Sequence, residues 1–347
     1  MTADEFLSWA LDPSRTHEER CALEQISETG VRWMAAKQKK PEPVNWEKAR
    51  EHARYRRLNP AYEPKLKKAD LRDTFEIFTE RGKIMLSLFE DRPLRSIEWV
   101  RFFPATTELS LDRIGAMDFS PLKALPKLKV LTFGDSEGED YRPIAGCSAL
   151  ESLRVTVGST WVLLDGWERL ESLRELTWIG NIHNMSSGPA LPALRQALFT
   201  NSITGELPLR DAHALPEMPH LEFLRVKSIF RLDGIERYPR LKNAVFHGPL
   251  RSAEPLAVLR EATSLCFETD VVKETIGHSL ITQSLPDLRP LAALPKLHIA
   301  RFKSPVPRDY SPLAEVPNLH ELTVEGCPAV EMEVAGIAAG LASWDSD

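Results

Sequence analysis

Short apolar runs recur along the middle of the chain in one fixed pattern. The segment DFSPLKALPKLKVLTF (118–133) carries apolar residues in a turn and then along a short strand, and DYRPIAGCSALESLRV (140–155) repeats it 22 residues later. Segments 287–302 and 309–324 repeat it again with the same offset of 22 residues. In all four segments an aspartate precedes the first leucine of the strand by ten residues. This recurrence indicates an internal repeat, which predicts a stacked array.

The frame L-x-x-L-x-φ, in which φ is an apolar residue, extends the repeat to ten copies. The spacing between copies varies from 20 to 35 residues, and the first residues of the frames are Thr106, Leu128, Leu150, Leu173, Leu194, Leu221, Leu241, Ala262, Leu297 and Leu319. Positions four and six are apolar in every copy, so they point to one side of a short parallel strand. Positions three, five and seven point to the other side, toward solvent.

This frame resembles that of leucine-rich repeat proteins, and its period is closest to the 22-residue class of internalin-type and SDS22-like proteins. The resemblance covers 104–327. It implies an α/β fold: a leucine-rich repeat solenoid with a curved parallel β-sheet and short 3-10, helical or irregular convex segments. The family usually places asparagine at the ninth position, where only Asn181 matches. We therefore expect the turns to be satisfied by other groups.

The N-terminal third has helical spacing. Residues 6–10 predict a short helix that stops at Pro13. Thr16 and Glu19 have capping-box spacing, in which each side chain accepts a hydrogen bond from a free backbone N–H, at the start of a second helix. A third helix is predicted around 45–57.

Alternating apolar residues replace this spacing from about position 71. Segments 75–79 and 83–89 predict a β-hairpin around the turn at 80–82, and a further strand is predicted at 97–102. These strands would cover the open edge of the array, as solenoids require. Four apolar residues near the C-terminus predict an amphipathic helix over the last repeat: Val334, Ile337, Leu341 and Trp344.

The predicted organisation has four parts. A helical N-terminal region occupies 1–70, and a strand-rich N-terminal cap occupies 71–103. The array of about ten repeats occupies 104–327, and a C-terminal cap helix occupies 328–347.

Composition indicates a globular protein in a reducing compartment. Hydrophobic residues make up 43% of the 347 residues and charged residues 27%. No stretch approaches the roughly 18 consecutive apolar residues of a membrane span, and the first ten residues do not resemble a signal peptide. The four cysteines are far apart in the sequence: Cys21, Cys147, Cys266 and Cys327. This spacing predicts scattered thiols and a cytoplasmic location.

The charge is unevenly distributed. Residues 31–72 hold thirteen Lys and Arg against five Asp and Glu, a net charge of +8, whereas the whole chain carries −6. The rest of the chain is therefore at −14. Solvated helix faces account for the basic segment most simply, and a site for an anionic partner is the alternative.

No sequence motif indicates catalysis. The chain has no GxxxxGK[ST], no GxGxxG after a strand, no HExxH and no GxSxG, and its nine histidines are scattered. We therefore predict a protein that is not an enzyme, with no catalytic residues, no metal ligands and no cofactor.

The solvent-facing positions of the strands are the candidate binding site. They combine arginine with exposed apolar residues, which are typical of protein interfaces. We predict that a protein partner binds the concave face through Arg154, Glu175, Ile179, Phe223, Arg225, Lys227, His247, Glu268, Ile299, Arg301 and Lys303. The long interval at 270–284 is either a binding loop, with Lys273, Glu274 and His278, or a degenerate repeat.

These observations predict a monomeric interaction scaffold with no membrane contact. By analogy with the family, it would be a bacterial inhibitor or immunity-type protein, or a regulatory protein. The alternative is a nucleic-acid-associated protein that uses the basic segment 31–72.

Overall fold

The repeated frame folds as parallel strands, each preceded by a 3-10 turn. The computed structural model describes 1–37, 63–86, 96–111, 118–136, 140–157, 162–180, 188–200, 209–227, 229–248, 250, 252–268, 287–303 and 309–325. The chain divides into two units, Met1–Leu173 and Arg174–Asp347, and each is described by itself.

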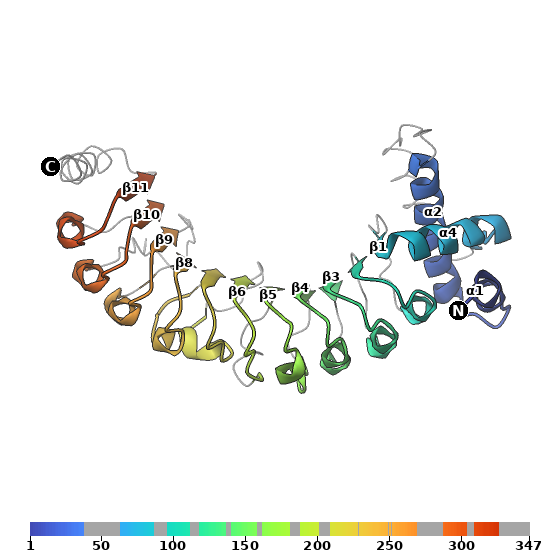
Figure 1. Cartoon of the computed structure of the whole chain (residues 1–347), viewed down its shortest axis with the longest axis horizontal. Helices are drawn as coiled ribbons and strands as arrows, with labels where there is room; N and C mark the ends of the chain where they lie inside the picture. Colours follow the sequence, from blue (N-terminus) through green and yellow to red (C-terminus); the bar gives the residue numbers. More distant parts are fainter. Residues whose placement is uncertain are drawn as a thin grey trace, which may run out of the picture. The chain divides into compact units, whose positions relative to one another are not determined.

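The first unit contains three helices and four strands (Figure 1). The helices are α1 (Ala3–Ala10), α2 (His17–Lys37) and α4 (Lys68–Arg81). The strands are β1 (Lys83–Leu86), β2 (Glu108–Leu111), β3 (Val130–Ser136) and β4 (Ser152–Val157). They pair in parallel in sequence order. The 3-10 segments are η1 (Glu98–Phe102), η2 (Ser120–Ala124), η3 (Arg142–Gly146) and η4 (Trp167–Arg169).

The second unit contains seven strands, which also pair in parallel in sequence order. They are β5 (Glu175–Ile179), β6 (Gln196–Thr200), β7 (Phe223–Lys227), β8 (Asn243–His247), β9 (Ser264–Glu268), β10 (Ile299–Lys303) and β11 (Glu321–Glu325). The 3-10 segments are η6 (Ala212–Ala214), η7 (Ile235–Arg237), η8 (Glu254–Val258), η9 (Arg289–Ala293) and η10 (Ser311–Glu315). The predicted leucine-rich repeat solenoid is confirmed.

The register of the strands matches the sequence frame residue for residue. Leu131 at position four lies opposite Leu109 on one side and Leu153 on the other, and all three side chains are buried. Aromatic residues extend the same packing between repeats: Phe267 stacks on Phe302 with ring centroids 5.2 Å apart. Each repeat therefore completes the core of its neighbours.

The aspartate that recurs ten residues before each strand caps the 3-10 segment. Asp118, Asp140, Asp287 and Asp309 each accept the backbone N–H two residues later, at 2.8 to 3.1 Å. The guanidinium group of Arg142 adds two hydrogen bonds to the Asp140 carboxylate. The aspartate thus satisfies a backbone donor at the helix start that would otherwise be free.

The helical predictions for the N-terminal region are confirmed in the residues that the structure describes. Helix α1 ends at Ala10, and its own capping box joins Thr2 and Glu5. At the start of α2, the Glu19 carboxylate accepts the Thr16 N–H at 2.9 Å, and the Thr16 hydroxyl accepts the Glu19 N–H at 3.2 Å. The capping box predicted there is present.

The predicted hairpin and the predicted strand at 97–102 are wrong. Segment 75–79 belongs to helix α4, because Leu71, Phe75 and Phe78 have helical spacing and are buried. Only the second arm is a strand, and β1 joins the parallel ladder beside β2. Segment 97–102 forms η1, which begins 22 residues before η2 and so takes the return position of a repeat.

An aromatic cluster joins the helices to the first return segment. Phe6 of α1 lies 5.7 Å from Phe75 of α4 and 5.5 Å from Phe102 of η1, between ring centroids. Phe103 contacts both Phe75 and Phe78 at 5.6 Å. The helices therefore share one core with the start of the array.

Several predicted features lie outside the described residues: the third helix at 45–57, Asn181, the segment 270–284 and the cap helix at 328–347. The four domain boundaries stay a prediction. None of the helices in the described ranges combines the length and apolar character needed to cross a bilayer.

A first test concerns the crossing of α2 and α4. A Cβ atom at Gly30 would lie 2.6 Å from the Thr74 Cα atom. Alanine normally stabilises a helix by about 1 kcal/mol relative to glycine, but overpacking costs about 1–3 kcal/mol. We expect Gly30→Ala to lower the free energy of unfolding in urea by roughly this second amount. Gly146→Ala is the control, because a Cβ there meets no atom within 4 Å. Equal stability of wild type and Gly30→Ala would contradict the close packing.

A second test uses pH. Side-chain hydrogen bonds from Arg142, Arg289 and Ser311 lower the pKa of Asp140, Asp287 and Asp309, respectively, below 3.8. A depressed pKa in the folded state adds stability above pH 3.8, and this stability disappears as pH falls through the folded pKa.

We therefore expect the triple variant Asp140→Ala, Asp287→Ala, Asp309→Ala to be less stable near neutral pH. Its free energy of unfolding should also fall less than that of the wild type between about pH 6 and pH 3. Parallel pH profiles for the two proteins would rule out these caps.

Candidate functional site

The candidate site is the strand face of the second unit, the surface formed by positions three, five and seven of β5 to β11. The strand register places equivalent positions side by side. Row five contains Thr177, Leu198, Arg225, Val245, Cys266, Arg301 and Thr323. These side chains are half-buried or exposed, whereas positions four and six are buried. The predicted division between core and solvent positions is confirmed on these strands.

Apolar side chains gather on this face over β6 to β8. Leu198 and Val245 flank Arg225 in row five, and Phe223 is on the same strand as Arg225 in row three. All three apolar side chains are half-buried by their neighbours and otherwise open to solvent. A cluster of this kind on a sheet surface is a feature of contact sites.

Arg225 is held in place by an ion pair that crosses a strand. Its Nη2 atom donates to Glu268 Oε2 at 3.1 Å, although β8 lies between their strands β7 and β9. The side chains are 36% and 20% exposed, respectively, so solvent screens this pair less than the other pairs of the face. The Arg225 Nε atom is buried and has no hydrogen-bond partner in the described part of the chain.

Two more cations of the face are paired on β10 and β11. Arg301 Nε donates to Glu321 Oε1 at 2.8 Å, and this hydrogen bond raises the pKa of Arg301. Lys303 Nζ lies 3.4 Å from Glu325 Oε2. Lys227 forms no ion pair with any described residue, so it is the cation of this face that is open to a partner.

The thiols on or near the strands are poor nucleophiles. Burial, followed by the negative charge of Glu268, raises the pKa of Cys266. Burial alone raises the pKa of Cys147 to about 11. Within the described ranges, no three His, Cys, Asp or Glu side chains come together as a metal site.

The structure brings together ten of the predicted site residues and separates four. The ten are on the strand face of the second unit: Glu175, Ile179, Phe223, Arg225, Lys227, His247, Glu268, Ile299, Arg301 and Lys303. Arg154 is exposed on β4 of the first unit. Lys273, Glu274 and His278 lie outside the described residues.

The prediction missed the carboxylate partners and part of the apolar cluster. Glu321 and Glu325 fix two of the predicted cations, and Leu198 and Val245 enclose a third between them. The aligned frame contains the signal for both, because acidic and basic residues stand at matching positions of neighbouring copies.

Comparison with known proteins gives similarity to solved repeat structures. No protein-family model matches the chain, and no characterised protein matches its sequence. An internalin from Listeria monocytogenes is similar, with 18% identity, a TM-score of 0.49 and coverage of 84% of this chain and 85% of that one. A leucine-rich repeat protein from Leptospira interrogans has 13% identity and a TM-score of 0.34, covering 67% of this chain and 78% of that one.

Double-mutant cycles test the ion pairs of the strand face. For Arg225→Met with Glu268→Gln we expect a coupling energy near the upper end of about 0.2–1 kcal/mol in urea unfolding. For Lys303→Met with Glu325→Gln, which is more exposed, we expect a value near zero. Equal coupling in the two cycles would contradict a fixed Arg225.

Proposed function

We propose that this leucine-rich repeat protein is a scaffold that binds a protein partner on the strand face of its second unit. The observation that supports this proposal most is the arrangement of Leu198, Phe223 and Val245 around an arginine held by its own ion pair. A free apolar cluster with a central arginine is the composition of an interface centre.

The mechanism is contact with a surface that is organised before binding. The strands fix the backbone of the face, and Glu268 fixes the Arg225 side chain. Binding therefore costs little further ordering of side chains on this protein. The partner would place an apolar side chain against Leu198 and Val245 and a carboxylate near Lys227.

A scaffold of this kind acts by occupying its partner's surface. An inhibitor or immunity-type protein would block an enzyme in this way, and a regulatory protein would hold one. The protein would work as a monomer in the cytoplasm, without catalysing a reaction itself.

The basic segment 31–72 offers the alternative, a nucleic-acid partner. The structure describes only 31–37 and 63–72 of this segment. Binding through it would weaken steeply with salt and would not depend on the strand face.

We expect Leu198→Glu combined with Val245→Glu to abolish recovery of the partner. Two carboxylates in the apolar cluster cannot be desolvated without a large cost. The measurement is affinity purification of the full chain from its native source after cross-linking, with nuclease, followed by mass spectrometry. The matched control is Val258→Glu, because Val258 is an apolar residue of η8 that is 49% exposed and lies outside the strand face.

The proposal requires one protein that is recovered in stoichiometric amount by the wild type and the control but not by the double variant. All three proteins should have similar melting temperatures. Recovery of the same protein by the double variant would refute the proposed site, and recovery that nuclease removes would favour the basic segment.

A further inference from the structure

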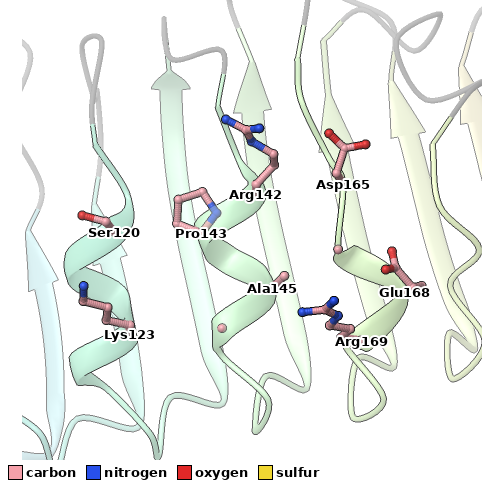
Figure 2. Close-up of a pocket in the computed structure, with 10 residues that line it drawn as sticks. Ser120, Lys123, Arg142, Pro143, Ala145, Asp165, Glu168 and Arg169 are labelled. Carbon is pink, nitrogen blue, oxygen red and sulfur yellow. The ribbon is translucent and has the colours of Figure 1, made fainter.

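A groove lies across the 3-10 segments of the first unit. Its volume is about 560 Å³, within the range of ligand sites. Segments η2, η3 and η4 supply its walls, and Figure 2 shows Lys123 and Arg169 on opposite sides of η3. The lining residues are Ser120, Lys123, Arg142, Pro143, Ala145, Gly146, Asp165, Gly166, Glu168 and Arg169.

The floor of the groove is small and its rim is charged. Pro143, Ala145 and Gly146 of η3 carry little side-chain volume, so a ligand backbone can approach closely. Among the described residues, the side chains of Lys123, Glu168 and Arg169 form neither a salt bridge nor a hydrogen bond. The groove therefore offers both charge signs to a ligand.

The chain contains a second copy of the groove's η4 wall, and there the same side chains are used. The sequence LDGWER at 164–169 recurs as LDGIER at 232–237. In the second copy Arg237 Nη1 donates to the carbonyls of His213 and Leu215, both at 3.3 Å. Glu236 Oε1 lies 3.9 Å from His213 Nε2.

The packing of the two copies explains the difference. A Cβ atom at Gly234 would lie 2.7 Å from the His213 backbone nitrogen, so η6 fills the space beside that glycine. At Gly166 the nearest neighbour of such a Cβ is the Ala145 Cβ, at 3.2 Å. A Cβ at Gly146 would meet no atom within 4 Å. The first copy is open where the second is filled by the chain itself.

We propose that this groove binds a short peptide segment of another protein, which supplies what the segment around His213 supplies in the second copy. Backbone carbonyls of the peptide accept hydrogen bonds from Arg169. A basic side chain of the peptide meets Glu168, and Asp165 adds negative charge on the same side. Lys123, on the opposite side of η3, takes an acidic group.

This proposal is independent of the strand face. The groove belongs to the first unit and is built from 3-10 segments, whereas the proposed partner site belongs to the strands of the second unit. Either can fail without the other.

The test is selection from a phage-displayed library of random peptides of about twelve residues, run in parallel on three forms of the full chain. These are the wild type, Gly146→Trp and Val258→Trp. Tryptophan at position 146 fills the groove, and position 258 is the matched control because it is the last residue of η8 as 146 is of η3. Similar melting temperatures would show that all three are folded.

We expect peptides with a basic residue to be enriched on the wild type and on Val258→Trp but not on Gly146→Trp. One such peptide, made synthetically, should bind Glu168→Gln with Arg169→Gln about tenfold or more weakly, since charge-assisted hydrogen bonds are lost. Enrichment of the same peptides on all three forms would overturn the proposal. So would no enrichment on the wild type, or a peptide whose affinity is unchanged by the two glutamines.

Discussion

The parallel register between neighbouring strands is the constraint on which the rest of the structure depends. No repeat has a core of its own, because the leucines at positions four and six are buried against those of the adjacent strands. A slip of one residue would turn every apolar side chain to the solvent side. The same register that buries the leucines therefore decides which residues stand side by side on the strand face.

The two sides of each repeat use polar groups differently. On the return side, aspartates cap the 3-10 segments, and Trp167 Nε1 donates to the Tyr141 carbonyl at 3.0 Å, so polar groups mainly close turns. On the strand face, ion pairs join side chains of different repeats, as between Arg225 and Glu268. The groove of the first unit departs from this rule, because charged side chains of its return side are left without partners.

The sequence predicted the elements whose signal is periodic, and it failed where two periods overlap. Every strand frame from Thr106 onward matched the register because leucine spacing records burial directly. Segment 75–79 was misassigned because its β-favouring aromatic and isoleucine residues outweighed the helical spacing of Leu71, Phe75 and Phe78. The site residues followed from the frame, but the pair of Arg225 with Glu268 did not, since it joins strands that are not neighbours.

Site-specific photo-cross-linking tests the central claim most directly. A benzoylphenylalanine placed at position 198 stands on the strand face, and one at position 258 stands on η8 as the control. The account predicts that illumination of the full chain in its native source joins one protein to position 198 and not to position 258. Identical products from both positions, or no product from position 198, would contradict binding on the strand face.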